Sequence, residues 1–77
     1  MRLINQADKD LTNLLKEKFI LAKKIDKLYL YIKTGDIPKY ISSFEFSLMI
    51  EQFEAMRIYY ETLDERIDYL KAYVETH

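Results

Sequence analysis

Residues 46–74, FSLMIEQFEAMRIYYETLDERIDYLKAYV, decide the fold class of this chain. Apolar residues recur in this stretch at alternating intervals of three and four positions: Phe46, Met49, Phe53, Met56, Tyr60, Leu63, Ile67, Leu70 and Val74. Such intervals place side chains along one stripe of an α-helix, and an average of about 3.5 residues is typical of left-handed coiled-coil packing. The stretch therefore predicts one long amphipathic helix.

The first half of the chain carries the same pattern. Its members are Ile4, Ala7, Leu11, Leu14, Lys18, Leu21, Ile25, Leu28 and Ile32. Lys18 is the one polar residue in the two stripes, which we call the seams. A lone polar residue in a seam either sets the register of the pairing or extends its charged end to solvent at the seam edge. We predict a second helix here, so that helices cover about residues 5–33 and 42–75.

The segment between the two seams contains signals for the end of one helix and the start of the next. Residues 34–38, Thr-Gly-Asp-Ile-Pro, end the first helix, and Gly35 suits the left-handed position after a helix. Ser42 and Glu45 have the spacing of a capping box, and Ile41 and Phe46 have that of a hydrophobic staple. At the other end of the first helix, either Asn5 or Asp8 is the expected cap.

A connection of about eight residues predicts that the two helices pack antiparallel. Residues 5–33 carry a net charge of +3 and residues 42–77 one of −5, so the two segments attract each other. We expect Lys18 to lie beside Met56 and Tyr60, whose phenol oxygen is a suitable acceptor. The prediction is an all-α, coiled-coil-like, antiparallel two-helix hairpin that forms a single domain over residues 1–77.

Many apolar residues fall outside the seams, and two helices alone would leave them exposed. They are Leu15, Phe19, Ile20, Ala22, Tyr29, Leu30, Tyr31, Phe44, Ile50, Ile58, Tyr59, Tyr69 and Tyr73. A helix that is apolar over more than one stripe is normally covered, and small chains rarely build a sufficient core alone. We predict a homo-oligomeric helical bundle. Two alternatives stay open: a helix-swapped assembly, and a monomer that uses this surface for another protein.

Several classes of function are excluded by composition. The chain has no Cys, one His at position 77 and one Gly, so no catalytic triad, metal site or glycine-rich phosphate loop is expected. The prediction is a non-enzyme without cofactor or metal. A net charge of −1 and an acidic second helix argue against binding to duplex nucleic acid or to an anionic membrane. No targeting or membrane-spanning segment is evident, which predicts a cytoplasmic protein.

Two groups of residues are candidates for binding. Lys16, Lys23, Lys24 and Lys27 lie along one side of the first helix, with Tyr31 at the next turn, and their ammonium groups and aromatic ring suit a small anionic nucleotide. Arg57, Tyr59, Arg66 and Tyr73 lie outside the seam of the second helix and suit a protein partner.

Two short motifs carry a resemblance to known proteins. They read L-x-E-K…K-I-x-K-L, at residues 15–18 and 24–28, and Q-x-x-A-M-x-x-Y-x-x-x-L-x-x-R-I, at residues 52–67. In both, the chain resembles short, uncharacterised helical proteins encoded by bacteriophages. The resemblance implies a viral origin and action inside a bacterial cell, where small phage proteins often bind a host defence component or sequester a signalling nucleotide.

The functional prediction is therefore a phage accessory or anti-defence protein that binds and blocks a host component. One alternative is an oligomeric sponge that sequesters a small anionic, nucleotide-type signal in pockets between subunits. Another is a purely structural coiled-coil assembly protein.

Overall fold

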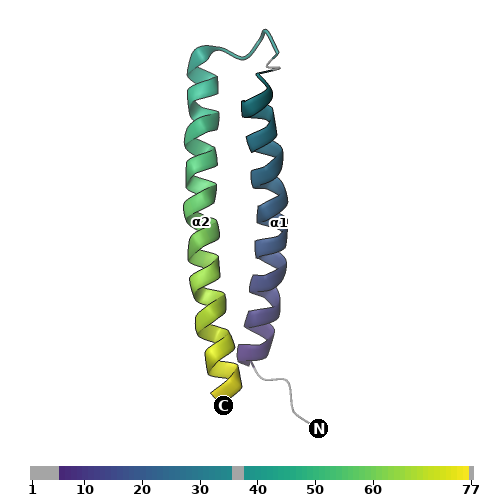
Figure 1. Cartoon of the computed structure of the whole chain (residues 1–77), viewed down its shortest axis with the longest axis vertical. Coiled ribbons are helices and arrows are strands. Elements are labelled where there is room, and N and C mark those ends of the chain that lie inside the picture. Colours follow the sequence, from purple (N-terminus) through teal and green to yellow (C-terminus); the bar gives the residue numbers. More distant parts are fainter. Residues whose placement is uncertain (1–5, 36–37, 77) are drawn as a thin grey trace.

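A computed structural model describes residues 6–35 and 38–76 of the 77-residue chain. Helix α1 (Gln6–Thr34) and helix α2 (Ser43–Thr76) run antiparallel, side by side, over a molecule that measures 58 × 18 × 16 Å (Figure 1). The predicted all-α two-helix hairpin is confirmed. Each of the predicted helix bounds differs from the observed one by a single residue.

Gly35 ends α1 in the predicted way. Its φ of 67° lies in the left-handed region, which residues with a Cβ adopt at a cost. At the start of the helix, Asp8 lies in the first turn instead of at the cap position, because α1 begins at Gln6. Asn5, the other expected cap, lies outside the described residues.

The start of α2 is specified by Ser42. The backbone N–H of Glu45 donates a 3.1 Å hydrogen bond to Ser42 Oγ, and the N–H of Phe46 donates one of 2.9 Å to the Ser42 carbonyl. The predicted N-cap at Ser42 is therefore confirmed. Since the first N–H groups of a helix have no partner within the helix, this side chain satisfies a donor that is otherwise left to water.

We expect Ser42→Ala to lower the free energy of unfolding by about 1 kcal/mol, because the cap bond to Glu45 is lost. The matched control is Ser47→Ala. The Ser47 hydroxyl donates back to the Ser43 carbonyl within the helix, and alanine is the better helix former there. Urea unfolding followed by circular dichroism compares the two variants. An equal loss of stability in both would contradict the cap.

The hydrophobic core lies in the part of the hairpin farther from the turn. Leu14, Leu21, Leu63 and Ile67 are its buried residues. Half-buried side chains pack against them: Leu11, Ile25, Met56, Tyr60 and Leu70. All nine belong to the predicted seams, which confirms that the seams face each other.

Lys18 lies at the edge of this core. Its ammonium group forms an ion pair with Asp64 and lies 5.3 Å from the centre of the Tyr60 ring. The predicted position beside Tyr60 is confirmed, whereas the carboxylate of Asp64 was not anticipated. The hydrogen bond to Asp64 raises the pKa of Lys18 above its ordinary value. The ion pair therefore contributes to stability at neutral pH, and the contribution from the Lys18 charge is lost as the pH rises above about 10.5. Because the Lys18 and Asp64 side chains are 31% and 42% exposed, this contribution is small.

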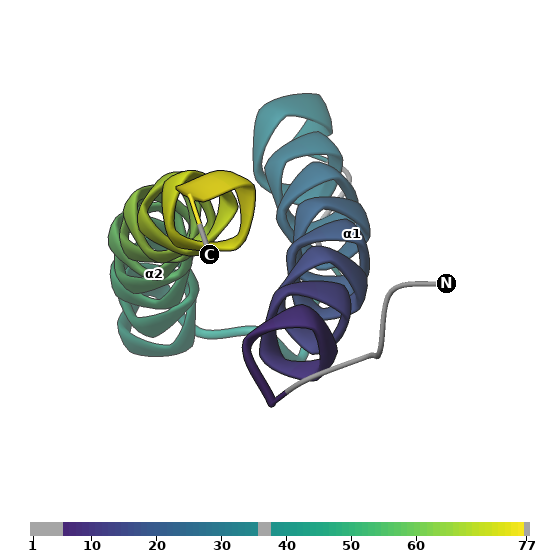
Figure 2. The same ribbon diagram turned by 90° about the horizontal axis from the view of Figure 1, so that it is seen from below.

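The two helices form a single layer, and Figure 2 shows no third element covering either side of it. Large apolar side chains therefore remain exposed on both helices: Leu15, Phe19, Ile20, Tyr29, Leu30, Phe44, Leu48, Ile50, Ile58, Tyr59, Tyr69 and Tyr73. Within the described residues, neither helix contains an apolar stretch of the length needed to cross a bilayer. Self-association, which would cover the exposed residues, stays a prediction.

Candidate functional site

A shallow groove of about 370 Å³ lies between the helices, on one side of the layer. It is lined from α1 by Lys24, Lys27, Leu28 and Tyr31, and from α2 by Gln52 and Met56. Lys24, Lys27 and Tyr31 follow one another at intervals of three and four residues on α1, which brings their side chains to one side of that helix. We call this side of the layer the groove face.

The groove combines three kinds of surface. Lys24 and Lys27 are exposed and provide two ammonium groups, while Tyr31 is half-buried and provides an aromatic ring. Leu28 and Met56, both half-buried seam residues, add apolar surface. Ammonium groups bind phosphate oxygens, and an aromatic ring provides a stacking surface for a planar base. The arrangement therefore suits an anion that carries an apolar or aromatic group.

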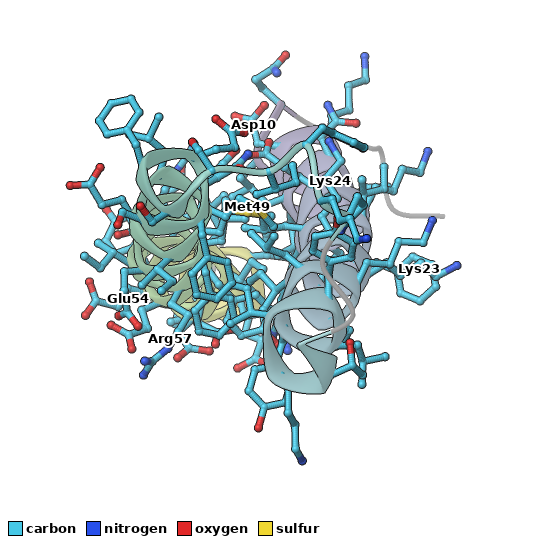
Figure 3. The ribbon with its side chains drawn as sticks, turned by 90° about the horizontal axis from the view of Figure 1, so that it is seen from above. Asp10, Lys23, Lys24, Met49, Glu54 and Arg57 are labelled. Atoms are coloured by element: carbon cyan, nitrogen blue, oxygen red, sulfur yellow. The ribbon has the colours of Figure 1, made fainter. Side chains whose placement is uncertain are left out.

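Lys23 does not belong to the groove, although it is next to Lys24 in sequence. Its ammonium group lies 4.4 Å from the centre of the Phe19 ring, and the side chain points away from α2 (Figure 3). Neighbouring residues in a helix differ by about 100° in direction. The structure thus separates Lys23 from Lys24 and Lys27, although all three were predicted to lie on one side of the helix.

Arg57 lies on the opposite side of the layer from Lys24 (Figure 3). It lines a different groove, with Asp26 and Glu61, and its guanidinium group is 3.4 Å from a carboxylate oxygen of Glu54. Carboxylates surround this arginine. We call this side of the layer the acidic face.

Arg66 lies on the groove face but nearer to the open end of the hairpin. It lines a third groove, together with Asp10, Thr62, Glu65 and Tyr69. Tyr59 and Tyr73 are seven residues before and after Arg66, so these three residues form one row on α2, and both tyrosines are exposed. Gln52 belongs to the same row and lines the groove, which places Tyr59 and Tyr73 on the groove face as well.

Gln52 and Met56 line the groove but were not among the predicted binding residues. Gln52 could not be found from the register, because a hairpin with a turn near residue 37 brings position 52 level with about residue 22, whereas in the structure Gln52 lines the groove with Leu28. Met56 was assigned only to the core, but its half-buried side chain also reaches the groove. No cluster of three or more His, Cys, Asp or Glu suited to a metal ion occurs within residues 6–35 and 38–76.

A family model described as Sequestin matches residues 9–69. The matched region includes both sides of the groove and each of the predicted binding residues except Tyr73. No curated protein and no solved structure matches the chain.

Proposed function

Because this chain belongs to the Sequestin family, we propose that it is a non-catalytic binding protein that sequesters a small anionic ligand of the nucleotide type. The family name suggests sequestering, and the groove between α1 and α2 supports a small ligand as the target. The single observation that carries the proposal is the convergence of Lys24, Lys27 and Tyr31 on one groove.

The chemistry of the groove favours a nucleotide over a simple inorganic anion. Two lysines within one turn match the charge of a phosphate chain. Beside them, the Tyr31 ring and the apolar surface of Leu28 and Met56 offer contact to a base or sugar. Among the described residues that line the groove, no nucleophile is paired with a base, and a binding role in which the ligand is released unchanged fits this lining. The bacteriophage resemblance supports a role in a host bacterial cytoplasm, where removing a signal would act against defence.

A second candidate function is the blocking of a host protein, and the exposed apolar residues favour it. An exposed apolar surface of this extent is typical of a protein-binding site. A binding protein that held its target only through this surface would have no need of the two groove lysines. Binding of a nucleotide would therefore distinguish sequestering from the blocking of a host protein. It would also distinguish sequestering from a purely structural role.

The test is isothermal titration of the chain with ATP, inorganic pyrophosphate and adenosine at low ionic strength. We expect ATP to bind tightest, pyrophosphate to bind more weakly and adenosine to bind weakest, and we expect ATP to be recovered unchanged. A saturating ligand at about 100 times its dissociation constant adds about 2.7 kcal/mol of stability, which thermal unfolding would detect independently. Absence of binding by both phosphate compounds would contradict the proposal and leave the protein-blocking and structural functions.

A further inference from the structure

We propose that a second copy of this chain covers the groove face, related to the first by a twofold axis parallel to the helices. In this arrangement α1 of each copy packs on α2 of the other, and the two copies enclose the ligand between them. The inference rests on the proposed function for its ligand, while the interface itself rests on the distribution of charge over the two faces of the layer.

An uncharged row on α2 supports burial of the groove face. Leu48, Ala55, Thr62 and Tyr69 follow one another at seven-residue intervals, and all four are exposed. Thr62 and Tyr69 line the third groove, which identifies the row as part of the groove face. Exposed residues of a helix are normally rich in charge, so a row without charge along the length of α2 indicates a second packing surface.

The opposite side of α2 has the contrary character. Glu54, Glu61 and Asp68 also follow one another at seven-residue intervals, and Glu54 lies on the other side of the layer from Lys24 (Figure 3). A twofold packing through this acidic face would bring Leu15 and Phe19 of one copy against carboxylates of the other. Burying carboxylates against apolar side chains is costly. The groove face is therefore the side that a second copy covers.

The register of the hairpin determines which residues meet. Lys18 pairs with Asp64, and Leu28 lies level with Gln52 and Met56. A twofold axis along the helices preserves these levels, because it moves each residue around the axis without shifting it along the axis. Lys24 and Lys27 of one copy then meet the uncharged residues Tyr59 and Ala55 of the second copy.

Charge is complementary elsewhere in the same register. Glu17 of one copy comes level with Arg66 of the second copy, and the twofold axis repeats the pair. The lysines of the two copies approach one another near the axis, where they repel until an anion neutralises them. The ligand is therefore expected to strengthen the dimer, and the second copy's Tyr59 closes a groove that a single hairpin leaves open.

The face is large enough for a stable dimer. A face of 58 by 18 Å presents a projected area of about 1,000 Å² on each copy, compared with about 800 Å² per partner in a standard stable interface. Packing through one face also converts two single layers into a four-helix bundle, in which the uncharged row of α2 is buried.

The test is the molar mass by light scattering after size exclusion, with and without pyrophosphate, for a matched pair of variants. We expect wild type to have twice the monomer mass of 9.3 kDa. With pyrophosphate, we expect the dimer to persist at lower protein concentrations than without it. Ala55→Arg places a long charged side chain in the interface, so we expect the monomer mass. Ala72→Arg makes the same change at an exposed position outside the groove face of the same helix, so we expect the dimer mass.

A second set of variants tests the register without adding bulk at Ala55. We expect Arg66→Glu alone and Glu17→Lys alone each to weaken the dimer at least tenfold, and the double variant to regain it. A double variant no more dimeric than the single ones would overturn the register. Circular dichroism verifies that each variant keeps its helices.

Titration of the same variants with ATP separates this inference from the proposed function. Ala55→Arg adds positive charge near the groove, so charge repulsion would not weaken its binding of the anion ATP. A tenfold loss of ATP affinity in Ala55→Arg but not in Ala72→Arg would therefore support a site shared between the two copies. A wild-type monomer that still binds ATP would overturn the dimer and leave the proposed function standing. A dimer that is broken by Ala55→Arg but binds no phosphate compound would support the interface and overturn the proposed function.

Discussion

Leu63→Ala is expected to lower the free energy of unfolding by about 2–5 kcal/mol, which is the range for removing a fully buried leucine side chain. Leu63 is 0% exposed and belongs to the core formed with Leu14, Leu21 and Ile67. At about 0.05–0.15 kcal/mol per residue, a chain of this size has a total stability of only about 4–12 kcal/mol. The variant is therefore expected to be partly unfolded at 37 °C.

The control for this prediction is Ile58→Ala on the same helix. Ile58 is 64% exposed, so its truncation is expected to change the free energy of unfolding by less than about 0.5 kcal/mol. Urea unfolding followed by circular dichroism at 222 nm measures both. If Ile58→Ala were as destabilising as Leu63→Ala, the seam between α1 and α2 would not be the main core of the protein in solution.

The second large effect is expected from the combined variant Lys24→Glu/Lys27→Glu, which should weaken ATP binding at least about 100-fold. A hydrogen bond to a charged group contributes about 1.5–3 kcal/mol, and a tenfold change in affinity corresponds to about 1.4 kcal/mol. Loss of both ammonium groups of the groove is therefore expected to lower the affinity for ATP more than 100-fold. Repulsion between ATP and the two new carboxylates adds to this loss.

Lys16→Glu/Lys23→Glu is the matched control, because it makes the same change in net charge on the same helix. Lys16 and Lys23 are seven residues apart, and Lys23 points away from α2 (Figure 3). These two variants are titrated at physiological salt instead of at low ionic strength, because screening there reduces the effect of charges more than about 8 Å away. Only a small loss of ATP affinity is then expected from the control. Equal losses in the two variants, measured by isothermal titration, would show that the attraction is general electrostatics and not a site.

Much of the fold follows from local patterns that are independent of tertiary contacts. The seams predicted both helices, and Gly35 and Ser42 predicted their neighbouring ends to within one residue. These residues act through their own backbone geometry or through a hydrogen bond to a residue three positions away. Asp8 was one of two expected caps, but it lies inside α1, since several residues near a helix start have suitable side chains.

The candidate site was less accessible to prediction. Lys23, Lys24 and Lys27 are a single cluster in sequence, yet only Lys24 and Lys27 line the groove. Arg57 and Arg66 were grouped as one partner surface, and the structure places them in different grooves. The periodicity of a helix specifies the directions of its side chains relative to one another. It does not specify on which side of the two-helix layer each side chain lies.

By itself the sequence determined that this protein consists of two long helices and that their apolar seams face each other. Only the tertiary structure decided that Gln52 and Met56 complete the groove of Lys24, Lys27 and Tyr31, and that Asp64 pairs with Lys18. The physical reason is that the seam pattern is a property of each helix alone. The groove and the ion pair depend instead on the relative rotation and level of two helices, which are set by packing across the whole interface.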